Sequence, residues 1–294
     1  MISVVAHRGD SESARENTPE SIRAAIEAGA DWVELDLQLT RDGACVVLHD
    51  DTLLRLWGLP RRTRELDLDE LSAPGHGECR IPTLSEALAL VASLAGERPG
   101  GVDVMLDVVD PEVATRAARV VARACDEQPL RVQWCGSVAA MTLVREDLPT
   151  ARIVHNHPGG ELDLDLVARL GSAAVNVEWT RQDERPVDQA HRRGLDVACW
   201  TVDDAETMSW LIDLGVDAIT TKRPRLARRL LAGGTSPLAL VWDGLDTAAT
   251  RWGLPPELMR WTAVARELAV WANGFTPTAA LGQVAAKART TRTW

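Results

Sequence analysis

Two short hydrophobic runs near the N-terminus each end in a histidine. His7 and Arg8 follow the first run, and His49 and Asp50 follow the second. Histidine transfers protons near neutral pH, and the planar guanidinium of arginine offers paired donors that fit the oxygens of a phosphate. A single such pair is common on protein surfaces. Two histidines at strand ends would provide an acid and a base for the cleavage of an ester.

Acidic residues lie between the two histidines. In Trp32–Gln38, Glu34 and Asp36 share one face of an expected strand, because side chains alternate along a strand. If the opposite, hydrophobic face packs against helices, both carboxylates point into a sheet interior, where they repel each other and lose hydration. A divalent cation removes this conflict, and a site made only of oxygen ligands suits Mg²⁺ or Ca²⁺. A polar, solvent-facing side of an edge strand would show the same pattern.

A third carboxylate, Asp107, lies near the end of the next expected strand and would complete a set of three metal ligands. It could instead cap the helix expected from Pro111, although Asp110 is better placed for that role. Two histidines and a metal meet the needs of phosphodiester cleavage. One imidazole takes a proton from the nucleophile, the other protonates the leaving alkoxide, and the cation and Arg8 stabilise the developing charge.

These residues are positioned by eight strand-then-helix repeats. The patterns predict strands at Ser3–His7, Trp32–Gln38, Val102–Val109, Leu130–Trp134, Ala151–His155, Ala174–Val177, Asp196–Thr201 and Asp217–Thr220. They predict helices at Pro19–Gly29, Leu84–Ala95, Pro111–Asp126, Val138–Arg145, Leu164–Leu170, Val187–Arg193, Ala205–Leu214 and Arg225–Leu231. The repeats indicate an α/β fold, a (β/α)8 TIM barrel whose active face lies at the carboxyl ends of the strands. An open doubly wound sheet is the alternative, but its glycine-rich first turn is absent.

Two segments break the alternation. After the turn at Arg41–Gly43 and an extended run at Ala44–His49, the stretch Asp51–Arg80 is expected to cross the barrel mouth. The C-terminal residues 236–294 hold six basic and four acidic residues and five of the eleven tryptophans. We expect a barrel of residues 1–235 and a Trp-rich helical extension of residues 236–294 packed on its outside. A lid or a partner surface is the alternative for this extension.

Composition limits the possible partners and location. The net charge of −11 argues against a general nucleic-acid binder but not against a small phosphate ester, because a bound cation reverses the local field. The five scattered cysteines are expected to be free thiols, rather than a disulfide framework or a zinc site. No export leader and no run long enough for a transmembrane segment is found, so a cytoplasmic location is expected.

Several motifs occur in a fixed order. They are His7-Arg8-Gly9, Glu16-Asn17-Thr18-Pro19, Glu34-x-Asp36, Thr40-Arg41-Asp42-Gly43 and His49-Asp50, followed later by Ile81–Leu84, Cys199–Asp203 and Gly215–Thr220. In this order and spacing the chain resembles the glycerophosphodiester phosphodiesterase family over about residues 3–231. The C-terminal extension is not covered by the resemblance.

The resemblance implies a role for each matching residue. His7 and His49 would be the acid–base pair, Arg8 would bind the phosphate, and Glu34 and Asp36 would bind the metal, Mg²⁺ or Ca²⁺. Glu16 and Asn17 would lie at the mouth and position the substrate or His7, and Trp200 would line the pocket.

The chain departs from the family pattern at two places. Where the family has Glu-x-Lys on the third strand, this chain has Asp107 and Val109, so a shorter ligand remains and one cation is lost. Where the family has a Thr- and Gly-rich stretch, this chain has the hydrophobic loop Leu53–Pro60. This loop favours a lipid-like or terpenoid group. Trp134, Trp179 and Trp200 would either support such a pocket or pack between barrel and helices.

We therefore expect a metal-dependent phosphodiester hydrolase that acts on a glycerophosphodiester or lysophospholipid-like ester, with water or a substrate hydroxyl as the nucleophile. A metal-dependent lyase or cyclase, similar to a terpene synthase and acting on an isoprenyl diphosphate, is a second hypothesis. A non-catalytic barrel that binds a partner through its tail is a third, against which the retained histidines and carboxylates argue. The expected partner is a small phosphate ester, and the oligomeric state is left open.

Overall fold

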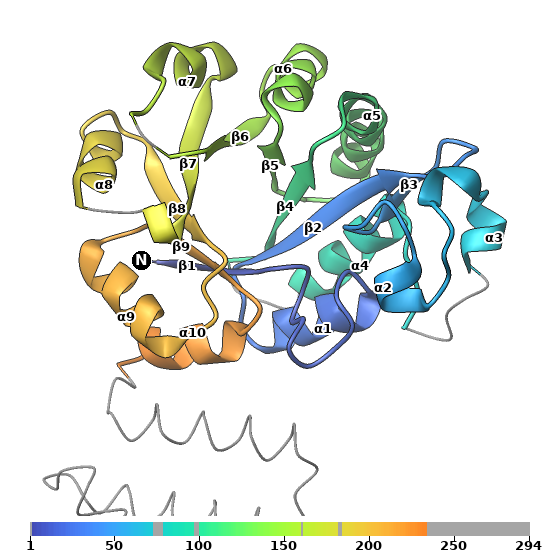
Figure 1. Ribbon diagram of the computed structural model, residues 1–294, viewed down its shortest axis with the longest axis horizontal. Helices are drawn as coiled ribbons and strands as arrows, with labels where there is room; N and C mark the ends of the chain where they lie inside the picture. The colour runs from blue at the N-terminus through green and yellow to red at the C-terminus, as the bar shows by residue number, and fades with distance from the viewer. Residues whose placement is uncertain (1, 73–78, 97–99, 160, 182–183, 234–294) are drawn as a thin grey trace, which may run out of the picture. The chain divides into compact units, whose positions relative to one another are not determined.

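Eight parallel strands close into a barrel. The computed structural model describes residues 2–72, 79–96, 100–159, 161–181 and 184–233. The barrel strands are β1 Ser3–Ala6, β2 Trp32–Leu39, β4 Asp103–Val108, β5 Val132–Gly136, β6 Arg152–His157, β7 Ser172–Glu178, β8 Asp196–Trp200 and β9 Ala218–Thr221. Each pairs with the next, and β1 pairs with both β2 and β9, which closes the ring (Figure 1). The predicted (β/α)8 TIM barrel is confirmed.

Helices surround the ring on its outside (Figure 1). They are α1 Pro19–Glu27, α4 Leu84–Ala95, α5 Pro111–Glu127, α6 Val138–Asp147, α7 Leu164–Leu170, α8 Glu184–His191, α9 Ala205–Leu214 and α10 Pro224–Leu231. Side-chain caps fix several of their starts, because the oxygens of Thr18, Thr83 and Ser137 accept hydrogen bonds from first-turn backbone N–H groups. Left-handed glycines at Gly171 and Gly215 end α7 and α9.

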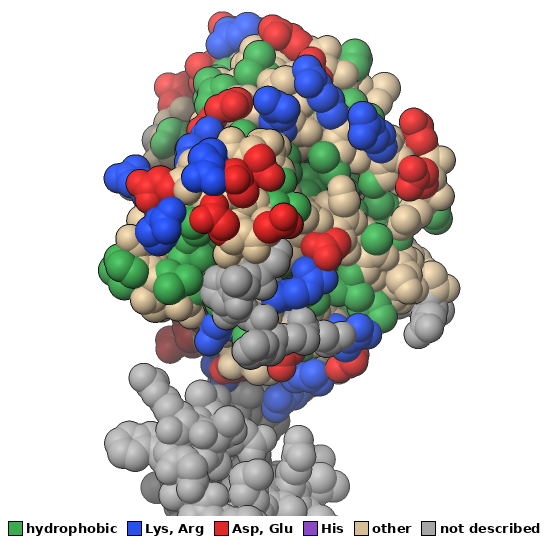
Figure 2. Space-filling view, turned by 90° about the vertical axis from the view of Figure 1, so that its right-hand side faces the viewer, with side chains coloured by type: hydrophobic (Ala, Val, Ile, Leu, Met, Phe, Trp, Pro, Cys, Tyr) green, Lys and Arg blue, Asp and Glu red, His purple; other side chains and the backbone are tan. Residues whose placement is uncertain are grey.

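The segment after β2 leaves the ring. Strand β3, Cys45–Val47, folds back antiparallel on β2, and α2 Leu54–Trp57, the 3₁₀ helix Thr63–Glu65 and α3 Leu68–Ser72 follow. This excursion has a small core of its own, formed by Val46, Leu48, Leu53, Leu66, Leu71 and Ile81. Acidic and basic side chains interleave on this side of the molecule (Figure 2). One example is Arg41, which pairs with Asp67 and Glu70.

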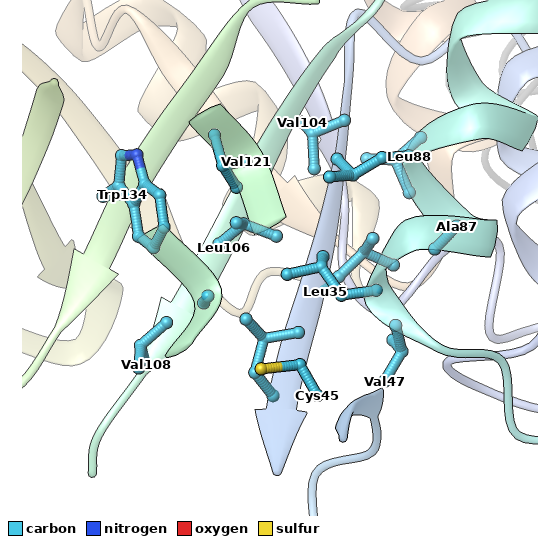
Figure 3. Packing of buried hydrophobic residues seen from close by; sticks show 14 of the residues in the cluster. Leu35, Cys45, Val47, Ala87, Leu88, Val104, Leu106, Val108, Val121 and Trp134 are labelled. Atoms are coloured by element: carbon cyan, nitrogen blue, oxygen red, sulfur yellow. The ribbon is translucent and has the colours of Figure 1, made fainter. Parts of the chain in front are cut away.

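The main core lies between the barrel wall and the helices. Leu35, Leu106 and Trp134 point outward from their strands toward residues such as Leu88 and Val121 (Figure 3). The hydrophobic face of β2 thus packs against the helices, which is the condition under which Glu34 and Asp36 point into the barrel. Burial of each such leucine contributes about 1.5–3 kcal/mol. Trp134, at 1% exposed, packs in this layer and does not line a pocket at the barrel mouth.

A second, smaller hydrophobic layer fills the barrel interior. It contains Val5, Met105, Cys135, Val154, Ala174, Ala198 and Ala218. Met105 alternates with Asp103 and Asp107 along β4, so both aspartates point into the barrel, one toward each end.

The chain divides into two units, Met1–Arg228 and Arg229–Trp294. The predicted helical extension of residues 236–294 lies outside the described residues. Within the part of the chain that the structure describes, every helix falls short of the length and hydrophobicity that a membrane span requires.

Candidate active site

Three carboxylates meet at the carboxyl end of the barrel. Glu34 and Asp36 come from β2 and Asp107 from β4, and the parallel register sets Asp36 directly beside Asp107. One oxygen atom from each of the three lies within 4.8 Å of the others. Glu34 is 4% exposed and Asp36 is 8% exposed. The three residues expected from the sequence as metal ligands are thus brought together.

The protein compensates only part of this negative charge. Burial raises the pKa of Glu34 well above its usual value, and the neighbouring Asp36 and Asp107 raise it further. Burial and the charge of Asp36 raise the pKa of Asp107 to about 6. The Oδ1 atom of Asp107 is buried without a hydrogen-bond partner. An unpartnered buried oxygen in an all-oxygen donor set fits a hard divalent cation.

Arg8 lies at the edge of the carboxylate cluster. Its backbone N–H donates to Glu34 at 2.8 Å, its Nε lies 3.0 Å from Asp36 Oδ2, and its Nη1 donates to Glu16 at 2.8 Å. The guanidinium therefore borders the place where a cation and an anionic ester would meet, as the predicted phosphate contact requires.

An unusual bend of the backbone brings Arg8 to this position. Arg8 has a φ of 59° and Gly9 a φ of 80°. A β-carbon at Gly9 would lie 2.5 Å from the hydroxyl oxygen of Ser21 and 2.6 Å from its backbone carbon. Only glycine fits this close approach to α1. Strained backbone of this kind is frequent at functional sites.

Asn17 lies beneath the cluster. Its side-chain amide donates to Asp36 Oδ2 at 2.8 Å, its backbone N–H donates to the carbonyl of Arg8 at 2.9 Å, and it is 2% exposed. Burial raises the pKa of Asp36, while Arg8 and this amide oppose the rise. In this structure Asn17 orients Asp36. Its expected contact with the substrate stays a prediction.

The two histidines differ in their surroundings. His7 follows β1, and its Nδ1 is buried without a partner. Burial, helped by Arg8 and Lys222, lowers its pKa to about 3, so this imidazole is neutral at pH 7. The charge of His49 also affects the pKa values of His7, Asp36 and Asp107, so His49 lies close enough to interact with the cluster.

A carboxylate orients the ring of His49. Its Nδ1 lies 2.6 Å from Asp50 Oδ1. Because an ionised carboxylate only accepts hydrogen bonds, we assign the proton of this bond to Nδ1, which leaves Nε2 available for the substrate.

Arg55 is a site residue that sequence reasoning missed. Its Nε donates to Asp50 at 2.6 Å and its Nη2 donates to Glu16 at 2.6 Å. A hydrogen bond from Arg55 lowers the pKa of Asp50 to about 2. Burial would raise the pKa of Glu16, but its bonds to Arg55 and Arg8 hold that pKa below its usual value. Hydrogen bonds and ion pairs thus run from His49 through Asp50, Arg55 and Glu16 to Arg8.

Helix α2, which carries Arg55, is also held by a contact of Trp57. The guanidinium of Arg15 stacks over the Trp57 ring at 4.5 Å from the ring centroid. The sequence indicated only a hydrophobic loop here. The one available signal was an arginine five positions after Asp50.

Hydrophobic side chains border the mouth. Trp200, at 38% exposed, ends β8, and Val109, at 69% exposed, follows β4. Val138, at the start of α6, and Leu54, in α2, are also exposed. Exposed hydrophobic groups at the strand ends offer contacts to a hydrophobic part of a ligand.

Comparison with known proteins identifies relatives of this chain. The model of the family described as "Glycerophosphoryl diester phosphodiesterase family" matches residues 7–226. A glycerophosphodiester phosphodiesterase of Arabidopsis thaliana is 30% identical over 241 residues, which cover 78% of this chain and 73% of the relative. One of Caldanaerobacter subterraneus subsp. tengcongensis is 27% identical, over 79% of this chain and 98% of the relative.

Solved structures show the same fold. An Oleispira antarctica phosphodiesterase in complex with its product sn-glycerol-3-phosphate has a TM-score of 0.71 and 23% identity, covering 78% of this chain and 96% of its own. A glycerophosphodiester phosphodiesterase of Parabacteroides distasonis has a TM-score of 0.67 and 26% identity, covering 80% and 98%.

Proposed function

Because this chain belongs to the glycerophosphoryl diester phosphodiesterase family, we propose that it hydrolyses glycerophosphodiesters at the carboxyl end of its barrel. It is a phosphoric diester hydrolase. The observation that carries the proposed site is the convergence of Glu34, Asp36 and Asp107, together with the buried Asp107 Oδ1, which has no hydrogen-bond partner among the described residues. Neither the family nor the similar proteins support the isoprenyl diphosphate lyase or the non-catalytic barrel.

The metal would be held by the three carboxylates, and Mg²⁺ or Ca²⁺ fits their oxygen donors. Such a cation polarises a phosphoryl oxygen and stabilises charge in the transition state. Arg8, at the edge of the cluster, would bind a second phosphate oxygen and hold the ester in place.

The two histidines would divide the proton transfers. His7 is neutral at pH 7 and suits the base that takes a proton from the nucleophile, water or a substrate hydroxyl. His49 has a carboxylate partner that compensates its positive charge when it is protonated, so it suits the acid that protonates the leaving alkoxide. Arg55 contacts both Glu16 and Asp50, the partners of Arg8 and His49. These contacts would hold Arg8 and His49 in fixed positions relative to each other.

The test measures the release of glycerol phosphate from glycerophosphoethanolamine by purified protein, before and after exhaustive chelation. Chelation is expected to abolish release, and Mg²⁺ or Ca²⁺ to restore it. Glu34→Gln should remain inactive with either cation, whereas Asp67→Asn, at a surface ion pair, should behave as wild type. Full activity of the chelated protein would refute the metal site.

A lysophospholipid-like ester is the finer substrate that we propose. It is supported by the exposed Leu54, Val109, Val138 and Trp200, because each methylene of an acyl chain buried there contributes about 0.8 kcal/mol. The kcat/KM for lysophosphatidylethanolamine should exceed that for glycerophosphoethanolamine by about tenfold or more.

Two exposed tryptophans provide a matched test of this preference. Trp200→Ser should reduce the ratio of kcat/KM for lysophosphatidylethanolamine to kcat/KM for glycerophosphoethanolamine, and Trp210→Ser, on α9, should leave this ratio unchanged. An equal preference in wild type and Trp200→Ser would remove Trp200 from the substrate pocket.

We also propose a cytoplasmic location. Its support is that Cys45, Cys79, Cys125, Cys135 and Cys199 are all free thiols, as is usual in a reducing compartment. Cell fractionation that recovered the protein only outside the cytoplasm would contradict it.

A further inference from the structure

A cavity lies on the outer wall of the barrel, away from the three carboxylates. It is bounded by α4, α5 and the turn between β2 and β3, elements that contact one another. Its volume is about 370 Å³, in the range of small-molecule sites. Its lining residues are Gly43, Ala44, Cys45, Thr83, Ser85, Arg116, Arg119, Val120 and Arg123. The floor reaches the main core at Cys45, which Figure 3 shows beside Val47 at the edge of the packed cluster.

Three arginines of α5 line one side of this cavity. Arg116, Arg119 and Arg123 follow a spacing of three and four residues, which sets them on one face of the helix. None of the three guanidinium groups makes an ion pair or a hydrogen bond with any residue in the described ranges. Elsewhere on this strongly acidic protein, arginines such as Arg41 and Arg64 are paired with carboxylates.

Several acidic residues close in sequence to the lining residues are already engaged. Glu86 accepts hydrogen bonds from Arg80 and from the cap residue Thr83. Asp42 accepts from Thr40 and from the backbone of Leu68. At the start of α5, Glu112 is paired with Arg64. Among the described residues, no carboxylate forms an ion pair with the three arginines.

The opposite side of the cavity adds a donor. Thr83 and Ser85 lie at the start of α4. The N–H and the hydroxyl of Thr83 are already bonded to Glu86, so Ser85 is the residue that adds a hydroxyl donor. Three guanidinium groups and a hydroxyl facing a common space bind an anion that has several oxygens and more than one charge. A diester, with a single negative charge, fits this set less well than a monoester.

We propose that this cavity binds a soluble phosphomonoester dianion through Arg116, Arg119 and Arg123, at a site separate from the catalytic end of the barrel. A recessed volume between two helices favours a small soluble molecule over a membrane surface. The proposal does not depend on the substrate of the barrel mouth.

The experiment compares three forms of the full-length, metal-free protein. The test variant carries Arg116→Gln, Arg119→Gln and Arg123→Gln. The control carries Arg169→Gln, Arg192→Gln and Arg193→Gln, which remove the same charge from exposed positions outside the cavity. Tm is measured against increasing ethyl phosphate and, at matched ionic strength, dimethyl phosphate. A ligand that binds the native state raises Tm, and any contribution of the barrel mouth is common to all three forms.

The wild type and the control should show the same rise of Tm with ethyl phosphate, and the test variant less than half of it. Dimethyl phosphate should raise Tm less than ethyl phosphate in the wild type. Equal rises in wild type and test variant would overturn the proposal. Crystals soaked in tungstate provide a second measurement that needs no variant. An anomalous peak between Arg116 and Ser85 is expected, and a peak only at the barrel mouth would contradict the site.

Sedimentation with phosphatidylcholine vesicles that contain phosphatidic acid separates a lipid headgroup from a soluble ester. No arginine-dependent sedimentation is expected. Vesicle binding that is lost in the test variant, without a response to ethyl phosphate, would show that the ligand is a membrane lipid and would overturn the proposal.

Discussion

Strand β4 carries one aspartate at each end of the barrel, and the surroundings of the two carboxylates are opposite. Asp103, at the amino end, is paired with Arg131 at 2.6 Å and accepts from Gln133 at 3.0 Å. Asp107, four residues later, faces Glu34 and Asp36, and its Oδ1 has no partner. Both aspartates point into the same barrel. The protein pairs the carboxylate of Asp103 at the amino end, and it compensates only part of the negative charge around Asp107 at the carboxyl end.

Other residues repeat this contrast. Asp31, before β2, accepts from the backbone of Val4 and pairs with Arg228. Asp217, before β9, accepts from the backbone of Val197 and contacts His191. Such bonds join neighbouring segments and stabilise the ring. In this barrel, paired carboxylates at the amino ends of the strands stabilise the fold, and carboxylates at the carboxyl ends form the proposed active site.

The largest expected effect is on catalysis at Asp107. Asp107→Asn should lower kcat by about a thousandfold, because the proposed cation loses an ionised ligand. Asp103→Asn should keep kcat within about threefold of wild type, since it lies at the other end of the same strand. Steady-state assays with saturating Mg²⁺ or Ca²⁺ measure both. Equal losses in the two variants would break the contrast between the ends.

A smaller loss is expected at the histidines. His7→Ala and His49→Ala should each lower turnover by about a hundredfold or more, because each removes one of the proposed proton transfers. Both variants should still bind the metal, which is measured as a rise of Tm when the metal is added. Wild-type turnover in either variant would remove that histidine from the mechanism.

Stability should respond in the opposite direction to activity. The pKa of Asp107 is about 6 in the folded protein, above the value of about 3.9 expected in the unfolded chain. The folded state therefore holds this proton more tightly, and the metal-free protein loses stability as pH rises from about 4 through 6.

Asp107→Asn lacks this titration. At pH 7.5 in a chelator it should be more stable than wild type by about 1–3 kcal/mol, and near pH 4 the two should be equal. Asp103→Ala should instead be less stable than wild type by about 1–2 kcal/mol, because it loses two hydrogen bonds. Urea denaturation at both pH values tests these signs. A destabilised Asp107→Asn at pH 7.5 would show that its charge is compensated after all.

The smallest expected effect on activity is at Arg55. This residue separates side chains that support the site at the carboxyl end from those that take part in the reaction. Arg55→Ala should lower kcat/KM by about three- to tenfold, since it releases Asp50 and Glu16 without removing a reacting group. Arg62→Ala, at a surface pair with Asp51, is the matched control and should have no effect. Equal kcat/KM in wild type and Arg55→Ala would show that Asp50 and Glu16 keep their positions without this arginine.

Sequence reasoning succeeded where a period or a local signal exists. The alternation in β2 predicted that Glu34 and Asp36 share one face, because this signal lies within the element that it shapes. The barrel followed from the number of repeats. Sequence reasoning left Trp134 open between a pocket and the packed layer, although it shares a face of β5 with Val132, which also packs against the outer core.

The missed parts of the site depend on distant partners. Arg55 meets Glu16, which lies 39 residues earlier, and nothing local marks this pair. The buried position of Asn17 depends on its left-handed backbone, with a φ of 59°, and on the amide bond to Asp36. Both contacts appear only when the fold brings separate loops to one end of the barrel.

The ring closes between its first and last strands, and this order has a consequence for synthesis. The backbone N–H of His7 donates to the carbonyl of Thr221, 214 positions later, at 2.8 Å. While Thr221 is still inside the ribosome, the nascent chain already contains Glu34, Asp36 and Asp107. It still lacks β9, the strand that pairs with β1 beside His7. The proposed catalytic site is therefore complete only after the last strand of the barrel has been synthesised and has left the ribosome.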